Sequence, residues 1–328
     1  MIQTLQVYTS ISTDPYRNLA IEEYLLDSVK KNCCILYLWQ NKNTVVIGKN
    51  QNGWKECRTE LLKEEGGLLA RRLSGGGAVF HDLGNLNFTF LVNTEDYDVD
   101  RQLTVIQNAC HLLGIDARRS GRNDLLCMER KFSGNAFYKT KEKCYHHGTL
   151  LLHADTEKMS RYLNPSAAKL KAKGVDSVRS RVLNLCEVKP DLTVDAMMAA
   201  LIQSFAAVYG GEPMSLCEQD LDQRVIRDLA GRYASWEWNY GRELPMDIVF
   251  SDRFSWGEIT LGLQIRSGRI CHVQVYSDSM DWTLPGQIEE CLSGCRLDLA
   301  DMIGALLSSK LSPAQQQDLA ELIRQQLH

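Results

Sequence analysis

The chain has 328 residues, of which 44% are hydrophobic and 24% are charged, and its formal net charge at pH 7 is −4. This composition is typical of a soluble globular protein, and the length predicts about two domains. It argues against a membrane protein, because no apolar run approaches the ~18 residues of a membrane span. It also argues against nucleic-acid binding, because the balance is acidic and the basic residues are not interleaved with aromatic ones.

The first residues lack a basic stretch followed by an apolar core, so we expect a cytoplasmic protein without an export signal. Eleven cysteines are scattered along the chain without a CxxC pair. In a protein that is not exported, reduced thiols fit this pattern better than a disulfide framework. Cys291 and Cys295 are four residues apart, but no second ligand pair lies near them in sequence, so we do not expect a metal site there.

The predicted elements of the first 210 residues mix helices and strands. Asp14-Pro15 is typical of a helix N-terminus, with a capping Asp and a proline at the first helical position, and an amphipathic helix follows to Val29. The clearest helix runs from the cap Thr193 to a stop at Gly210. Further helices are predicted over 103–113 and 159–163, and strands over 35–39, 44–47, 68–73, 78–80, 86–90 and 148–152.

The pattern changes near residue 240. Short strands follow over 254–276, separated by the hairpin signal Ser267-Gly268, and two more helices are predicted over 297–307 and 313–327. We therefore predict two domains, residues 1–243 and residues 244–328. Because strand–turn–strand units recur, the fold class should be α+β, with mixed, largely antiparallel sheets flanked by helices and a small α+β C-terminal domain.

A glycine-rich loop is the strongest chemical signal. Arg71 and Arg72 come shortly before three consecutive glycines, Gly75 to Gly77. Such a run can turn several backbone N–H groups toward one anion, and arginines beside it are suited to phosphate or carboxylate oxygens. It is neither a Walker loop, because no Lys-Ser or Lys-Thr follows, nor a dinucleotide-binding fingerprint, because Ala78-Val79-Phe80 is predicted to be a strand. A flexible hairpin with chance arginines is the alternative.

Three further segments carry candidate polar residues. Asn123 and Asp124 lie in a predicted turn, where an Asn can pair with a purine edge and an Asp can hold Mg²⁺ near a phosphate. Lys131 precedes a predicted Ser-Gly turn. The adjacent His146 and His147 would point to opposite faces of a strand, so they cannot easily share a metal, and His147 is more typical of a hydrogen-bonding structural histidine.

The middle of the chain is basic. From Arg118 to Arg181 there are fifteen Lys or Arg residues against six Asp or Glu residues. This surplus favours an anionic ligand or an acidic partner surface, with an ordinary solvated surface as the alternative. The basic segment 169–181 contains Gly174 and fits either a loop that closes over a polyanion or an exposed linker.

Together these motifs resemble those of the lipoate–protein ligase A family, which lies within the biotin and lipoate ligase superfamily. The resemblance covers nearly the whole chain and includes the small C-terminal domain of the larger, bacterial-type members. It rests on the ordered motifs at 71–85, Lys-x-Ser-Gly at 131–134 and His-His-Gly-Thr-Leu at 146–150, and it extends from Asp14-Pro15 through 177–181 to 235–241.

The resemblance implies a two-step reaction. The lipoate carboxylate attacks the α-phosphate of ATP, giving lipoyl-AMP and pyrophosphate, and a lysine of an acyl-carrier domain then attacks the carbonyl of this mixed anhydride. ATP and Mg²⁺ are the implied cofactors, and lipoic acid is the substrate. The implied partners are the lipoyl domains of 2-oxoacid dehydrogenase E2 subunits and the glycine cleavage H protein, and a monomer is the expected state.

The resemblance also assigns roles to residues. Lys131 matches the catalytic lysine, whose ammonium would bridge the lipoate carboxylate and the α-phosphate. Asp124 matches the acidic position near Mg²⁺, and Asn123 would lie close to the adenine. Arg72 and the loop backbone would hold the ATP phosphates, and segment 169–181 would order over the adenylate. The predicted cofactor-binding residues are Arg72, Ser74, Gly75, Gly76, Gly77, Ala78, Val79, Phe80, Asn123, Asp124, Lys131, His147 and Arg179, with Asp124 also the predicted Mg²⁺ ligand.

The dithiolane ring and alkyl chain of lipoate need an apolar tunnel. We expect Leu73, Val79 and Phe88 in its walls, with Ser74 and His81 nearer its mouth. One residue departs from the family pattern: Tyr138 stands where some members carry a basic residue. Lys139 or Lys141 would supply that charge, so we expect altered local contacts and retained activity.

Other functions stay open at this point. An octanoyltransferase of the same superfamily would need no ATP and a nucleophilic cysteine, for which Cys144 is the candidate, but the form of the glycine loop and the C-terminal domain argue against it. A lipoyltransferase that accepts only preformed lipoyl-AMP is poorly separated by sequence. A non-catalytic adenylate-binding module is disfavoured by Arg72, Asp124 and Lys131, and a biotin ligase by the missing N-terminal helix-turn-helix.

Overall fold

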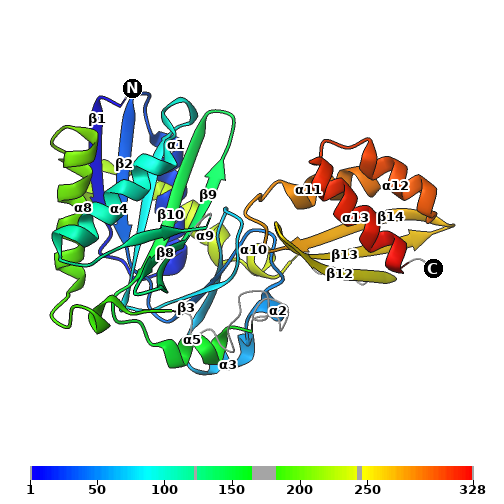
Figure 1. Ribbon diagram of the computed structural model, residues 1–328, viewed down its shortest axis with the longest axis horizontal. Helices are drawn as coiled ribbons and strands as arrows, with labels where there is room; N and C mark the ends of the chain where they lie inside the picture. Colours follow the sequence, from blue (N-terminus) through cyan, green and yellow to red (C-terminus); the bar gives the residue numbers. More distant parts are fainter. Residues whose placement is uncertain (1, 122–123, 165–181, 242–245, 327–328) are drawn as a thin grey trace.

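A computed structural model describes residues 2–121, 124–164, 182–241 and 246–326. Figure 1 shows two bodies side by side, which we call the N-terminal part (up to residue 241) and the C-terminal part (from residue 246). The predicted domain boundary at 243/244 lies outside the described residues. Within the described ranges, no helix is long and apolar enough to cross a membrane.

The N-terminal part is organised by an eight-stranded mixed sheet with the strand order β11-β1-β2-β6-β10-β9-β8-β7. β1 pairs in parallel with β2 and β11, and every other pair in this sheet is antiparallel, in agreement with the predicted α+β class. Its strands are β1 (Thr4–Thr9), β2 (Cys33–Trp39), β6 (Asn85–Asn93), β7 (Arg118–Ser120), β8 (Asp124–Cys127), β9 (Arg130–Lys139), β10 (Lys143–Leu151) and β11 (Met214–Ser215).

Helices cover both faces of this sheet (Figure 1). α4 (Val99–Leu112) and α8 (Val194–Tyr209) pack on one face around buried apolar side chains that include Phe88 and Phe205. The other face carries α1 (Pro15–Ser28) and α9 (Gln223–Ala234). The predicted caps of α1 and α8 are confirmed: Asp14 accepts from the N–H of Tyr16, and α8 lies between the cap Thr193 and a left-handed Gly210 (φ 75°).

A second, three-stranded sheet has the order β4-β3-β5 and faces the side of the large sheet that carries α1. β2 and β3 are consecutive in sequence but belong to different sheets, so the turn between them changes sheets and closes no hairpin. The strands are β3 (Thr44–Ile47), β4 (Leu68–Arg71) and β5 (Val79–His81), and the shorter helices are α2 (Gly53–Glu56), α3 (Thr59–Glu64), α5 (Thr156–Tyr162), α10 (Trp236–Asn239), η1 (Thr94–Asp96), η2 (Leu185–Glu187) and η3 (Glu218–Asp220).

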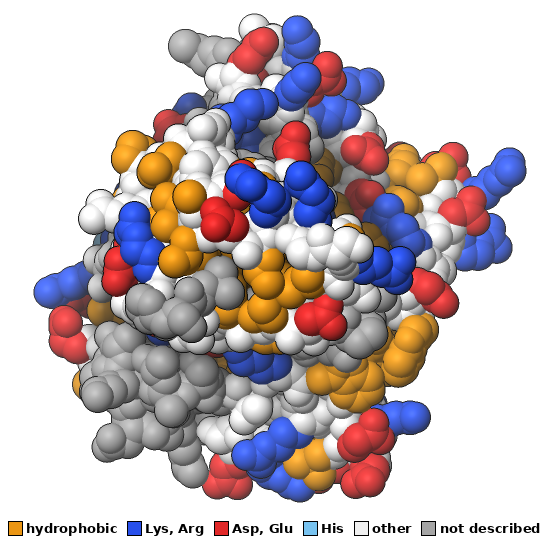
Figure 2. All heavy atoms as spheres, turned by 90° about the vertical axis from the view of Figure 1, so that its right-hand side faces the viewer, with side chains coloured by type: hydrophobic (Ala, Val, Ile, Leu, Met, Phe, Trp, Pro, Cys, Tyr) orange, Lys and Arg blue, Asp and Glu red, His pale blue; other side chains and the backbone are white. Residues whose placement is uncertain are grey.

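The C-terminal part is an antiparallel three-stranded sheet with helices on one side (Figure 1). Ser267 and Gly268 both have positive φ (50° and 72°), as a two-residue turn needs to match the twist of its strands, so the predicted hairpin is confirmed. The outer face mixes Lys and Arg with Asp, Glu and hydrophobic side chains (Figure 2). Its elements are β12 (Ile248–Phe254), β13 (Gly257–Arg266), β14 (Arg269–Ser277), α11 (Leu284–Leu292), α12 (Leu299–Leu307) and α13 (Pro313–Gln326).

One local prediction is wrong. The Ser133-Gly134 pair after Lys131 is not a turn, because β9 runs through it as a strand. Strands on both sides hold this stretch extended: Gly134 pairs with Asp124 of β8, and Asn135 pairs with Gly148 of β10. Two flanking ladders outweigh the local turn preference of Ser-Gly.

Candidate functional site

A cavity of about 320 Å³ lies between the two sheets of the N-terminal part. The large sheet and α1 line it with Leu19, Trp39, Asn87, Lys131, Gly134, Asn135, Ala136, His147, Gly148 and Thr149. The small sheet and the glycine loop line it with Val46, Arg72, Gly76, Gly77, Ala78, Val79 and His81. The C-terminal part supplies the remaining wall through Arg253, Ser255, Trp256, Gly257, Asp278 and Met280.

The cavity therefore brings Lys131 and the glycine loop together, as the sequence predicted. The loop also packs closely against the C-terminal part. The N–H of Gly76, whose φ is +86°, donates to the carbonyl of Ser279 at 2.9 Å. A Cβ at Gly75 would lie 2.4 Å from that same oxygen, so only glycine fits this contact. One of the N–H groups that we expected to face an anion is thus engaged by the C-terminal part.

Arg72 holds the glycine loop from inside. Arg72 is buried, and its Nη2 donates to the carbonyls of Gly75 (2.7 Å) and Gly77 (2.8 Å), while its Nε donates to Ser74 Oγ at 3.0 Å. Burial lowers the pKa of Arg72 to about 10, which still leaves it charged at neutral pH. Arg72 thus shapes the loop and also lines the cavity, and its expected contact with the ATP phosphates stays a prediction.

Arg71 is also a structural residue. Its guanidinium is buried and donates to five backbone carbonyls from two stretches of chain far apart in sequence. Those carbonyls belong to Gly48, Lys49, Gln51, Trp238 and Asn239. The charged group therefore ties α10 to the segment after β3.

Lys131 is aimed by an irregularity of β9. The register of β9 against β8 shifts between Leu125 and Leu126, so that Phe132 is an extra residue and turns into the core beneath the sheet. Nζ of Lys131 then lies 2.6 Å from Oδ1 of Asp124. The ammonium passes directly over Gly134, where a Cβ would lie 2.9 Å from Nζ. A glycine at 134 is what lets Lys131 reach across its own strand into the cavity.

The two adjacent histidines of β10 point to opposite faces, as predicted. His146 lies on the α4 side between Gln102 and Asn135, and burial lowers its pKa to about 3. His147 lies on the cavity side, with Nδ1 2.8 Å from Oε1 of Glu22 and Nε2 2.8 Å from Oγ of Ser74. Both ring nitrogens have partners, which fits the hydrogen-bonding structural role that the sequence suggested for His147, while its place among the cofactor-binding residues stays a prediction.

Glu22 was missed by the sequence analysis. It lies on α1, is 2% exposed, and connects His147 to Oγ of Thr89, which donates to it at 2.7 Å. The available signal was a carboxylate on the same helix face as Leu19 and Leu26, three residues before it and four after it. It anchors a buried chain of hydrogen bonds that leads through His147 and Ser74 to Arg72 and the glycine loop.

The tunnel residues were predicted only in part. Val79 lines the cavity, but Phe88 points to the opposite face of the large sheet, among the side chains of α4 and α8, and Leu73 belongs to the core under α1. Ser74 and His81 are buried (0% and 3% exposed) and do not lie at an open mouth. The ring of His81 stands edge-on to that of Trp39 with 6.0 Å between centroids, and Trp39 was not foreseen as a wall.

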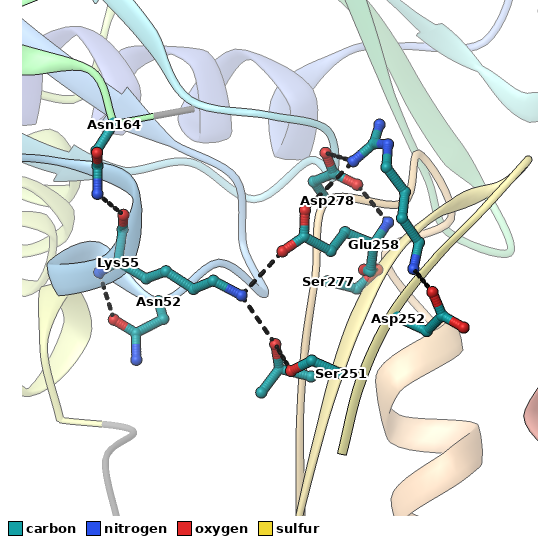
Figure 3. A network of polar contacts seen from close by, with 10 residues as sticks. Asn52, Lys55, Asn164, Ser251, Asp252, Glu258, Ser277 and Asp278 are labelled. Atoms are coloured by element: carbon teal, nitrogen blue, oxygen red, sulfur yellow. Dashed lines mark hydrogen bonds and ion pairs between the residues drawn. The ribbon is translucent and has the colours of Figure 1, made fainter. Parts of the chain in front are cut away.

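The junction with the C-terminal part is polar. Nζ of Lys55 on α2 lies 2.8 Å from Oε1 of Glu258 on β13 and 3.1 Å from Oγ1 of Thr260 (Figure 3). Nη1 of the cavity-lining Arg253 lies 3.4 Å from carboxylate oxygens of both Glu258 and Asp278. The sequence predicted no site residue in the C-terminal part. The residues of β12, β13 and β14 contain no motif to indicate that this part contributes to a cavity of the N-terminal part.

Several predicted residues lie elsewhere. Asn123, Arg179 and segment 169–181 are outside the described residues, and Asp124 contacts Lys131 without lining the cavity. Phe80 is part of the core behind the small sheet. Cys144 is buried on the α4 side of the large sheet, away from the cavity, and burial raises the pKa of its thiol to about 11, so it is a poor nucleophile.

Comparison with known proteins agrees with this geometry. Models of two families match the chain: the lipoyl protein ligase A/B catalytic domain at residues 14–206 and the bacterial lipoate protein ligase C-terminus at residues 244–323. A crystal structure of P. falciparum LipL1 in complex with lipoate is similar over 98% of this chain and 99% of that one, with 27% identity and a TM-score of 0.85.

Two further structures are similar over about three quarters of this chain. A bipartite lipoate protein ligase from Thermoplasma acidophilum, described with its E2 lipoyl domain, has 28% identity and a TM-score of 0.65 over 76% of this chain and 100% of that one. A lipoate-protein ligase A bound with ATP has 28% identity and a TM-score of 0.63 over 74% of this chain and 99% of that one.

Proposed function

The chain belongs to the lipoyl protein ligase A/B family of enzymes, and on that premise we propose that it activates lipoate with ATP and transfers the lipoyl group to lysines of carrier domains. In the first step a lipoate carboxylate oxygen forms a bond to the α-phosphorus, and the bond to the leaving pyrophosphate breaks. In the second step a carrier lysine amine forms an amide with the activated carbonyl, and AMP leaves with the bonding electrons.

The observation that carries this proposal is the position of Lys131. Its ammonium faces a cavity that also contains the glycine loop, so a carboxylate and a phosphate can meet at one cation. Two anions that must approach within bonding distance repel each other, and a fixed positive charge between them removes that repulsion and stabilises the transition state, an effect of several kcal/mol in an enclosed site. The backbone of Gly77, Ala78 and Val79 would receive the phosphates; these residues line the cavity, and Arg72 donates to the carbonyls of Gly75 and Gly77.

Asp124 is our proposed Mg²⁺ ligand. Mg²⁺ commonly takes one or two protein carboxylates and completes its shell with water and substrate phosphates, so a single carboxylate beside the catalytic lysine suits it. No cluster of three or more His, Cys, Asp or Glu side chains exists among the described residues to hold a metal independently of substrate. The ion would neutralise the phosphates and orient them toward Lys131. Asn123 and Arg179 stay proposed adenylate contacts.

Lipoyl domains of E2 subunits and the glycine cleavage H protein are the proposed partners. The similar Thermoplasma acidophilum ligase is described with its E2 lipoyl domain, and the basic surplus over 118–181 suits an acidic carrier. Modification of the carrier should therefore slow as ionic strength rises. Capture of the activated acyl group by hydroxylamine needs no docking, so its rate should not change with salt; equal salt dependence of the two reactions would refute electrostatic docking.

The central test is release of pyrophosphate on mixing the protein with ATP, Mg²⁺ and lipoate. We expect release by the wild type, a loss of at least about a hundredfold in Lys131→Ala, and no change in Lys310→Ala, whose side chain is exposed in the C-terminal part. No release by the wild type, together with carrier modification from synthetic lipoyl-AMP, would establish the lipoyltransferase alternative. Binding of lipoyl-AMP without carrier modification would establish the non-catalytic module.

A cysteine-dependent octanoyltransferase is disfavoured by the position of Cys144, and Cys144→Ser should retain ligase activity.

We also propose that residues 1–243 form the catalytic domain and residues 244–328 the accessory domain. The wall that Arg253, Trp256 and Met280 add to the cavity suggests that the accessory domain takes part in enclosing the substrates.

A further inference from the structure

The cavity-facing side chains of the large sheet form a row that starts at Lys131. Nζ of Lys131 lies over Gly134 of β9, and the N–H of Gly134 donates to Oγ1 of Thr149 on β10 at 3.3 Å. Thr149 pairs with Asn87 on β6, and Asn87 pairs with Trp39 on β2. Asn87 is thus two strands from the ammonium, roughly 10 Å away. A carboxylate held at Lys131 would place the far end of a medium-length acyl chain beside Asn87 and Trp39.

At this far end, His81 has a free donor. Nδ2 of Asn18 donates to the carbonyls of Ser12 and Gln40 and to Oδ1 of Asn41, which turns Nδ2 of Asn41 toward Nδ1 of His81 at 3.2 Å. His81 Nδ1 must then accept. Burial lowers the pKa of His81 to about 3, so the ring is neutral and its one proton is on Nε2. Nε2 is buried and has no hydrogen-bond partner in the described part of the chain.

Asn87 supplies a second free donor. Its Oδ1 accepts from Nδ2 of Asn85 at 2.9 Å, while its own Nδ2 is buried without a partner among the described residues. Asn87 is 1% exposed and His81 is 3% exposed, and both line the cavity. A buried donor without an acceptor is unfavourable, so two of them beside one end of a binding cavity indicate that the ligand brings acceptors there.

We propose that Asn87 and His81 select acids that carry sulfur at the far end of the acyl chain, and thereby favour lipoate over octanoate. This inference rests on the proposed function. The dithiolane sulfurs are weak hydrogen-bond acceptors at the position of the free N–H groups. Octanoate presents only CH₂ and CH₃ groups there, and both donors would stay buried and unpaired.

Apolar side chains in the cavity explain why a weak acceptor suffices. Leu19, Val46 and Val79 line the same cavity as His81 and Asn87, so an apolar ring has side chains to pack against, and the two N–H groups need only a weak acceptor. Leaving one buried donor unpaired costs a factor of roughly 5 to 150 in affinity. Because sulfur satisfies a donor only partly, we expect the preference for the sulfur-containing acid to lie near the lower end of this range. For the two donors together it should be about tenfold.

The test uses three acids with the wild-type enzyme: lipoate, octanoate and 5-cyclopentylpentanoate, which keeps the five-membered ring and replaces both sulfurs by CH₂. The measured quantity is kcat/KM for pyrophosphate release with saturating ATP and Mg²⁺. We expect lipoate to exceed the cyclopentyl acid about tenfold. Equal values for these two ring acids would overturn the inference, because shape alone would then explain the selection.

Two variants locate the effect. Asn87→Leu and His81→Phe each remove one free donor, the second while keeping a ring beside Trp39, and each should reduce the ratio of lipoate to cyclopentyl acid by about threefold while improving use of the cyclopentyl acid. Asn93→Leu makes the same change on β6 outside the cavity and should leave the ratio at its wild-type value. An unchanged ratio in both cavity variants would contradict the inference.

The outcomes separate this inference from the proposed function. If the wild type releases no pyrophosphate with any acid, the proposed activation chemistry is wrong. If it releases pyrophosphate without distinguishing the two ring acids, the ligase chemistry stands and the role of Asn87 and His81 falls. Melting temperatures of the variants show whether a variant is folded, and the ratio of two substrates on one enzyme preparation is independent of the fraction that is active.

Discussion

Nζ of Lys131 lies 2.6 Å from Oδ1 of Asp124, and each side chain keeps about a fifth of its surface exposed (21% and 19%). The proposed catalytic cation therefore already has a carboxylate neighbour before any substrate arrives. A carboxylate this close offsets part of the charge that the lipoate and phosphate groups would meet. If Mg²⁺ binds here as proposed, Asp124 would hold the metal, and the ammonium of Lys131 would then be available to the two reacting anions.

Replacing Asp124 by Asn should therefore change the metal dependence of the reaction. We expect Asp124→Asn to raise the Mg²⁺ concentration for half-maximal pyrophosphate release at least about tenfold, because a neutral amide is a weaker ligand for a hard cation. The measurement is the initial rate against Mg²⁺ at fixed ATP. A Mg²⁺ curve that superimposes on that of the wild type would show that Asp124 serves Lys131 alone.

Gly134→Ala should displace the ammonium with little effect on the fold. The new Cβ would meet Nζ and Cε of Lys131 at 2.9 and 3.0 Å, and this flexible end can move aside. A displacement of about 1 Å at a reacting centre costs up to about a hundredfold in rate. Pyrophosphate release should fall by that order while the melting temperature stays close to the wild-type value.

Gly231→Ala is the matched control for this change. Gly231 lies within α9, and apart from the adjacent backbone of its own helix nothing described would lie within 4 Å of its Cβ. We expect full activity and a gain in stability of about 0.5–1 kcal/mol, because alanine is the better helix former. A loss of activity in both variants would point to a general effect of the added methyl group and not to the position of Lys131.

Gly75→Ala should separate the glycine loop from the C-terminal part. Its Cβ would meet the backbone oxygens of Ser279 and Met280 at 2.4 and 2.9 Å, and backbone atoms cannot move as a side-chain tip can. We expect a larger radius of gyration in small-angle scattering with unchanged helix content. Lys55→Ala should have a much smaller effect, within about 1 kcal/mol of stability, because the side chain of Lys55 is 44% exposed and ion pairs of exposed side chains contribute little.

The free energy of unfolding should decrease as the pH is lowered through the range in which histidine titrates. Burial lowers the pKa values of His81 and His146 to about 3, while in the unfolded chain they are near 6.5. The unfolded state therefore takes up more protons as pH falls from about 6.5 to 3, and the free energy of unfolding decreases over that window by up to about 1.4 kcal/mol per pH unit for each histidine. Above pH 6.5 neither contributes a slope.

Urea unfolding between pH 6.5 and 5 measures this slope before most carboxylates titrate. His146→Gln should reduce it by about half. His272→Gln, at an exposed position on β14, is the control for replacing a histidine outside the core. A wild-type slope near zero in this range would mean that the two buried imidazoles are charged in the folded protein.

The sequence predicted those features that depend on neighbouring residues. Asp14-Pro15 begins α1, and Thr193 and Gly210 limit α8, because capping is decided within one helical turn. The family resemblance selected Lys131 and the glycine loop, and the structure brings both to one cavity. These are cases in which local chemistry and the final fold agree.

Other features depend on partners far away in the chain and could not be predicted. Ser133-Gly134 became strand because β8 and β10 flank it. Phe88 was assigned to the wrong face, because alternation shows that Phe88 and Asn87 point to opposite sides but not which side holds the cavity. The donors of Arg71 and Arg72 turned to backbone carbonyls that only the folded chain brings within reach.

The strand order of the large sheet has a consequence for synthesis of the protein. β1 (Thr4–Thr9) lies between β2 and β11 (Met214–Ser215), so its outer hydrogen-bonding groups lack their neighbour until about two hundred further residues have been made. During translation a nascent chain would present an open β-strand flank, which is the geometry that promotes association between chains. Ribosome-bound fragments that end before Met214 should therefore engage chaperones more than fragments that include it.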